Sequence, residues 1–148
     1  MARIEGHVTR ALVALDGGTP CSQAAQVMTE ERIGSIAVRE EGRIVGILTE
    51  RDLVARVLAD HAPSDLPIRR AMRTDVPTVT PAATDLECTA LMRDHATRHL
   101  LVEDGGEVVG VVSMRDLLRL MLTEKEWLID QLHTFIDGHD RPRADASP

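Results

Sequence analysis

The sequence GRIVGILTERDL at residues 42–53 returns sixty-four positions later as GEVVGVVSMRDL at residues 106–117. When residues 42–58 are compared with residues 106–122, 7 of 17 positions are identical. A repeat of this length indicates two copies of one supersecondary unit, neither of which can bury its apolar face alone. The best preserved part is an apolar strand, then a hydroxyl residue and an acidic residue at the start of a helix.

The length and composition restrict the class of protein. A chain of 148 residues with 43% apolar residues suits one compact domain, or two half-domains that share a core. The sequence has no apolar run long enough to span a membrane, and no apolar leader follows Met1. The net charge of −7 disfavours binding to nucleic acid or to anionic membranes. We therefore expect a cytoplasmic protein with neither of these partners.

Two rare residue types add detail. Cys21 and Cys88 lack C-x-x-C spacing, which predicts buried or semi-buried thiols in a reducing cytosol rather than a disulfide. Trp127 and Phe135 are the only aromatic residues, and both lie near the C-terminus. The main core must therefore be aliphatic.

Each half is predicted to fold as β-α-β-β-α. The fold class is α/β (α+β), with two pseudo-symmetric repeats packed together and a C-terminal helical extension along an apolar stripe that reaches Ile136. The predicted domains are repeat 1 at 5–62, repeat 2 at 63–122, the extension at 123–137 and a flexible tail at 138–148. The predicted elements are helices at 21–31, 49–60 and 85–95, strands at 34–38, 43–48, 77–81, 99–102 and 108–112, and a last helix capped by Ser113.

The two halves differ in one predicted respect. Met28 and Met92 stand sixty-four positions apart, whereas the segment 68–72 resembles the segment 8–12, which lies only sixty positions earlier. This comparison makes the first half four residues shorter, and its opening strand is not clear from the sequence. We therefore expect the second half to hold the better-formed site.

The repeated motif has the chemistry of a sugar-phosphate site. It consists of a glycine, two aliphatic residues, a hydroxyl residue and an aspartate three residues later, at Gly46, Thr49 and Asp52 and again at Gly110, Ser113 and Asp116. A helix N-terminus attracts phosphate, a hydroxyl donates to phosphate oxygen, and an aspartate accepts from two vicinal ribose hydroxyls. The glycine lets a ligand approach the strand, and Arg51 and Arg115 can add charge-assisted bonds to phosphate.

The same spacing has a structural interpretation. A hydroxyl residue followed three positions later by an acidic residue is a capping box, which satisfies the free N–H groups of the helix and needs no ligand. Occurrence of the motif twice, each time after a glycine and two aliphatic residues, favours the binding interpretation without excluding the structural one.

The motifs at 46–53 and 110–117 and the preceding segments at 28–34 and 92–100 resemble a pair of CBS domains, named after cystathionine β-synthase. CBS domains are regulatory modules that bind adenosyl ligands. The resemblance covers residues 5–122, and the pattern at 124–138 is similar to the tail of stand-alone bacterial CBS-pair proteins. It implies an adenosyl ligand (AMP, ADP, ATP, NAD(H) or S-adenosylmethionine) and a homodimer.

The resemblance also implies roles for individual residues. Thr49 and Ser113 would contact phosphate, and Asp52 and Asp116 would hold the ribose hydroxyls. The residues implied around the base are Gly34, Ser35 and Ile36 in the first half, and Thr78, Thr80, Arg98, His99 and Leu100 in the second. Leu101 stands where the family often has proline, and the first half lacks the Thr-Val-x-Pro pattern of residues 78–81.

The sequence features allow three classes of function. The first is a sensor that shifts between conformations when an adenosyl ligand binds and is read by a regulated protein. The second is a ligand-free dimerisation scaffold in which both aspartates only cap helices. The third, an enzyme acting on nucleotides, is disfavoured because Cys88 has no evident base and His95 and His99 are joined by no further metal ligand. We predict no catalytic residue, catalytic cofactor or metal site.

Overall fold

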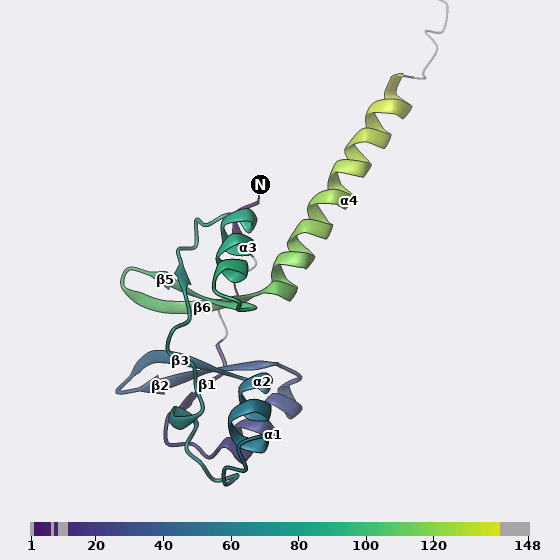
Figure 1. The fold of residues 1–148 in the computed structure, drawn as a ribbon. Helices are drawn as coiled ribbons and strands as arrows, with labels where there is room; N and C mark the ends of the chain where they lie inside the picture. The colour runs from purple at the N-terminus through teal and green to yellow at the C-terminus, as the bar shows by residue number, and fades with distance from the viewer. Residues whose placement is uncertain (1, 7, 9–11, 140–148) are drawn as a thin grey trace, which may run out of the picture.

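The computed structural model describes residues 2–6, 8 and 12–139, and it contains two similar halves (Figure 1). Each half has a three-stranded sheet with helices on one side. The first half comprises β1 (Ala14–Asp16), α1 (Cys21–Glu31), β2 (Ser35–Glu40), β3 (Arg43–Thr49), α2 (Glu50–Leu53) and a π-helix (Val54–Leu58). The second comprises β4 (Thr78–Val79), α3 (Asp85–Asp94), β5 (His99–Asp104), β6 (Glu107–Ser113) and α4 (Met114–His139). The predicted α+β fold is confirmed.

The internal symmetry is more regular than the sequence suggested. Ile4–Gly6 and Ile68–Arg70 each form a short 3-10 helix, and β1 and β4 also begin sixty-four positions apart. The predicted four-residue deletion was therefore wrong, because the counterpart of Ile68 is Ile4 rather than Val8. Most of the segment 8–12 lies outside the described residues. The opening strand β1 was missed because it has only three residues and contains no β-branched side chain.

The two sheets have the same topology and the same irregularities. The opening strand pairs in parallel with the next strand, which forms an antiparallel hairpin with the third. A bulge follows Val38 in one sheet and Val102 in the other. Each hairpin turns through two residues with positive φ, which suits a tight two-residue connection. The φ angles are 49° and 78° at Glu41 and Gly42, and 60° and 85° at Gly105 and Gly106.

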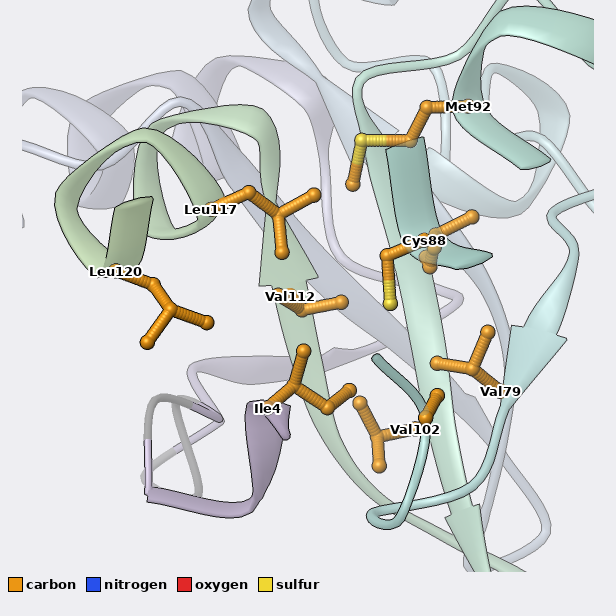
Figure 2. Packing of buried hydrophobic residues seen from close by; sticks show 10 residues of the cluster. Ile4, Val79, Cys88, Met92, Val102, Val112, Leu117 and Leu120 are labelled. Atoms are coloured by element: carbon orange, nitrogen blue, oxygen red, sulfur yellow. The ribbon is translucent and has the colours of Figure 1, made fainter. Parts of the chain in front are cut away.

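The two cores exchange one residue each. Ile4, from the N-terminal turn, is fully buried in the core of the second half, and Ile68 is fully buried in the core of the first. Figure 2 shows the Ile4 side chain pointing toward Val112 and Val102. Each half therefore completes the hydrophobic core of the other, as expected for repeats that cannot bury their apolar faces alone.

Backbone hydrogen bonds hold both exchanged segments in place. The Ile4 N–H donates to the Ala83 carbonyl at 3.0 Å, and the Ile68 N–H donates to the Thr19 carbonyl at 2.8 Å. Ala83 and Thr19 are themselves sixty-four positions apart, so the two contacts are related by the internal symmetry. This arrangement satisfies backbone groups that would otherwise be buried without a partner.

The two sheets face each other in the middle of the molecule, with α3 on one outer side and α1 and α2 on the other (Figure 1). A small apolar cluster of Ile47, Leu101 and Val111 is buried, and partly buried side chains of both halves pack against it. β3 is also bridged to the segment between the halves, because the Ile47 and Arg73 backbones exchange hydrogen bonds of 3.0 and 2.8 Å. The halves are therefore joined by direct packing as well as by the exchange.

The predicted helix 49–60 is partly a π-helix, and the reason lies in Arg56. Its counterpart in the second half is Leu120, which is buried in the core. An arginine at that position cannot be buried unpaired. The π-turn widens the helix so that Val57 enters the core instead, and the Arg56 guanidinium donates to the Met72 carbonyl at 2.7 Å.

The helical extension predicted at 123–137 is confirmed as a continuation of the last helix, because α4 runs without a break from Met114 to His139. It projects away from both sheets (Figure 1). Every side chain from Leu122 to Thr134 is exposed, and those from Phe135 onward lie outside the described part. Within residues 2–6, 8 and 12–139, no helix combines the length and apolar character needed to cross a membrane.

Because Ile4 and Ile68 are each buried in the core of the opposite half, removing either side chain should destabilise the protein. Ile4→Ala or Ile68→Ala should each lower the free energy of unfolding by about 2–5 kcal/mol, because each leaves a cavity in the opposite half. Val54→Ala, at a side chain that is 57% exposed, should change it by less than about 0.5 kcal/mol. Urea unfolding of the three variants measures these values, and a small effect of both isoleucine substitutions would contradict the exchange.

Candidate functional site

The repeated motif forms the same capping box at the start of α2 and of α4. The Asp52 Oδ2 accepts from the Thr49 N–H at 2.9 Å and from the Thr49 hydroxyl at 2.8 Å, and the Asp52 N–H is 3.2 Å from the Thr49 Oγ1. Asp116 Oδ2 accepts from the Ser113 N–H at 2.8 Å and from its hydroxyl at 2.6 Å. Both aspartates therefore carry out the structural role that the spacing predicted.

Each aspartate uses only one of its two carboxylate oxygens in this box. In the part of the chain that the structure describes, no hydrogen-bond donor reaches the Oδ1 of Asp52 or of Asp116. Asp52 is 7% exposed, and Asp116 is partly buried. A carboxylate can accept several hydrogen bonds, so the capping role leaves acceptor capacity on both residues.

Strand pairing holds the start of each helix beside the start of the preceding strand. Ser35 pairs with Thr49 across β2 and β3, and His99 pairs with Ser113 across β5 and β6. The Glu50 N–H donates to the Gly34 carbonyl at 3.1 Å, and the equivalent bond of 2.9 Å joins Met114 to Arg98. Five predicted residues of each half therefore meet at one place: Gly34, Ser35, Thr49, Arg51 and Asp52, and Arg98, His99, Ser113, Arg115 and Asp116.

His99 lies where the electric fields of the two motifs overlap. Burial lowers the pKa of its imidazole, the Asp116 and Asp52 carboxylates oppose that shift, and the Arg98 and Arg73 guanidinium groups add to it. A side chain that senses Asp52 of one half and Asp116 of the other must lie near the junction of the two repeats. The two helix starts therefore converge on the region of His99.

Arg73 is the residue of this region that sequence reasoning missed. It follows the 3-10 helix Ile68–Arg70, and no motif marks it. The backbone bridge to Ile47 holds it beside β3, where its charge reaches His99. Only the pairing of the inter-repeat segment with β3 brings it there.

Two of the predicted site residues have side chains that cannot face a ligand. Ile36 and Leu100 are at most 1% exposed and belong to the cores of the first and second half. Because side chains alternate along a strand, the preceding residues Ser35 and His99 point to the opposite face. Only the backbone of Ile36 and Leu100 can border a ligand.

Thr78 and Thr80 come from β4 and from the residue that follows its end. Both are exposed, and they line an open hollow of about 620 Å³. The other residues that line it come from the connection to α3 and from α3 itself: Val79, Ala82, Ala83, Glu87, Ala90 and Leu91. The hollow includes neither Asp52 nor Asp116, so the structure does not group these threonines with the motif.

The motif glycine at position 46 serves the fold rather than ligand access. A Cβ placed on Gly46 would lie within 2.4 Å of the Arg73 carbonyl oxygen and 3.1 Å from the Met72 sulfur. The inter-repeat backbone thus occupies the space that the sequence assigned to a ligand. The expectation of close ligand approach at Gly46 was wrong.

Both cysteines are free and buried, as predicted. They belong to different cores, Cys21 to the first half and Cys88 to the second. Burial, with smaller contributions from Glu87 and Asp85, raises the pKa of the Cys88 thiol to about 11. The thiol is therefore protonated at neutral pH and is a poor nucleophile.

The comparison with protein families decides the identity of the fold. The sequence model of the CBS domain matches residues 4–59 and residues 65–123. The chain belongs to the CBS domain family. The two matches correspond to the two structural halves, so the molecule is a tandem CBS pair.

Individual CBS proteins resemble the chain over most of its length. The CBS domain-containing protein YhcV of Bacillus subtilis is 27% identical over 117 residues, which span 79% of this chain and 84% of YhcV. The crystal structure of an uncharacterized conserved protein from Pyrococcus horikoshii matches with a TM-score of 0.76 and 30% identity, covering 81% of this chain and 92% of that one. The CBS domain protein PAE2072 from Pyrobaculum aerophilum, solved as a complex with AMP, matches with a TM-score of 0.71 and 29% identity, covering 83% and 97%.

The preference for the second CBS repeat as the better-formed site had two grounds. The four-residue deletion is not present in the structure, whereas the first repeat does lack the Thr-Val-x-Pro pattern of residues 78–81, so the preference stays a prediction on that ground alone. The capping boxes, strand pairings and helix starts of the two repeats are alike. The clearest local differences are Ser35 in place of His99 and Gly34 in place of Arg98.

The environment of His99 makes stability depend on pH. Its pKa is lower in the folded protein than the ordinary value of about 6.5, so the unfolded chain takes up the proton first as the pH falls. The stabilising contribution of the neutral imidazole is complete above about pH 6.5 and is lost as the pH falls toward the folded-state pKa. When the pH is lowered from about 7.5 to about 5.5, the free energy of unfolding measured in urea should fall more for the unmodified protein than for His99→Gln. An equal fall in both proteins would contradict the lowered pKa of His99.

Proposed function

We propose that this CBS pair is a regulatory sensor that binds an adenosyl ligand between its two repeats and signals by a conformational shift. The observation that carries the proposal is that Asp52 and Asp116, at helix starts of different repeats, both act electrostatically on the pKa of His99. In this proposal one bound molecule contacts both helix starts and therefore both repeats.

The proposed ligand contacts follow from the chemistry of the motif. The free Oδ1 of each aspartate accepts from the vicinal hydroxyls of a ribose, while Oδ2 stays in the capping box. Thr49, Ser113 and the first N–H groups of α2 and α4 attract the phosphate, and the exposed Arg51, Arg98 and Arg115 add positive charge. The base is bordered by the backbone around Ile36 and Leu100 and by His99.

The AMP complex of the Pyrobaculum aerophilum relative supports this class of ligand. AMP, ADP, ATP, NAD(H) and S-adenosylmethionine share adenine and ribose, and the motif addresses those shared parts. The hollows of about 620 and 430 Å³ include neither aspartate. In this proposal the ligand binds between the two helix starts instead.

Signalling follows from the way the repeats are joined. A ligand that contacts both α2 and α4 favours the relative arrangement of repeats in which both contacts are made. The shift is limited by the difference in affinity between the two arrangements. In this proposal the protein is a cytoplasmic homodimer, it needs no catalytic cofactor, and a regulated protein reads the change.

A structural scaffold without a ligand is the second candidate. The observation that favours it is the use of both aspartates as capping-box acids. An enzyme is the weaker alternative, since the Cys88 thiol is buried with a pKa near 11. Thermal unfolding in the presence of adenosyl compounds separates the three classes.

Thermal unfolding with a panel of adenosyl compounds tests the proposal. At one hundred times its Kd, a ligand should stabilise the protein by about 2.7 kcal/mol. We expect stabilisation by at least one compound and loss of that stabilisation in Asp116→Ala. Stabilisation by none, with the protein folded, would favour the scaffold, whereas product formation from a nucleotide would favour the enzyme.

The control separates ligand binding from helix capping. Thr84 and Glu87 form a third capping box, at the start of α3. Glu87→Ala should therefore lower the stability of the ligand-free protein by about 1 kcal/mol, as Asp116→Ala does, but leave the ligand effect intact. If Asp116→Ala also keeps the full ligand effect, Asp116 is a cap only. Isothermal titration of the unmodified protein gives the number of sites that fill.

A further inference from the structure

The outer part of α4 has an apolar stripe that nothing in the described molecule covers. Helix propensity alone rarely maintains an isolated helix of this length, and an amphipathic helix gains most of its stability from packing. The apolar side chains of the stripe fall on one face of the helix at 100° per residue, together with Lys125. All of them are more than half exposed: Leu118, Leu122, Leu128, Ile129 and Leu132.

The stripe continues into a hollow beside the second CBS repeat. This hollow of about 430 Å³ is lined by Asp85 at the start of α3 and by residues of α4 between Leu118 and Leu128. The surface that needs a partner thus runs from the body of the molecule along the projecting helix (Figure 1). Its elongated form suits a second helix lying alongside α4.

The charges along α4 are unevenly distributed. Arg115 and Arg119 outnumber Asp116 in its first two turns, whereas Glu124, Glu126 and Asp130 outnumber Lys125 further along. Two copies of α4 packed in parallel would place like charges together and would bring Lys125, which lies within the stripe, against its own counterpart. An antiparallel pair brings the basic end of each copy to the acidic part of the other.

We propose that α4 is the homodimer interface and that it pairs antiparallel with α4 of a second copy of this chain. The inference rests on the homodimer included in the proposed function and names the surface that forms it. In the favoured register Leu118 lies opposite Leu128 of the second copy, and Arg119 lies near Glu126 of the second copy. The second helix then occupies the hollow beside Asp85.

The oligomeric state of the full chain tests the proposal. Sedimentation equilibrium should show a dimer, and Leu128→Glu should raise its dissociation constant by roughly 30-fold or more, because a charge replaces an apolar side chain inside the interface. Trp127→Glu is the matched control. Trp127 is 64% exposed and lies about 200° around the helix from Lys125, on the face opposite the stripe, so this variant should remain dimeric.

The orientation is tested by exchanging charges. Arg119→Glu should raise the dissociation constant about fivefold at low salt, and adding Glu126→Arg to the same chain should restore it. In a parallel pair Arg119→Glu would not weaken the dimer. Tighter or unchanged association of that single variant would therefore overturn the antiparallel arrangement.

The remaining outcomes are also decisive. A dimer that persists equally in Leu128→Glu and Trp127→Glu would overturn the assignment of α4, and a monomeric unmodified chain would overturn the homodimer as well. Isothermal titration with AMP on the same samples reports ligand binding separately. Failure of the interface is thus distinguishable from failure of the proposed sensor function.

Discussion

The structure depends on the reciprocal exchange of Ile4 and Ile68 between the two hydrophobic cores. Neither CBS repeat contains all the apolar side chains that its own core needs, so each core is completed by a segment that precedes the other repeat's helices. The backbone bonds to Ala83 and Thr19 hold these segments in equivalent positions. Because each core contains a side chain that the segment before the other repeat supplies, the exchange ties the packing of each repeat to the placement of the other.

That placement creates the candidate site. With the sheets face to face, the starts of α2 and α4 approach the junction from different repeats, and Asp52 and Asp116 both act on His99. Each aspartate also caps its helix, so the residues that would bind a ligand already stabilise the protein without one. The structural and functional interpretations of the motif are therefore compatible, and only a matched capping-box control separates them.

The departures from internal symmetry have identifiable causes. Arg56 stands where the second repeat has the buried Leu120, and the helix responds with a π-turn and a bond to the Met72 carbonyl. The other large difference is the length of α4, which continues well beyond the second repeat. The first departure preserves packing within the pair, whereas the second provides the surface that we assign to a second copy.

The sequence by itself determined the repeat, the β-α-β-β-α order, the bounds of α1 and the capping of α2 and α4, because these depend on side-chain pattern within a few residues. It did not reveal β1, the partner of Ile4 or the position of Arg73. Those features depend on which distant segments pair, and β1 is too short to show a periodic pattern. Sequence spacing likewise assigned Gly46 to a ligand, whereas the tertiary structure placed the Arg73 backbone there. Local pattern thus set the elements, and long-range packing decided which residues meet.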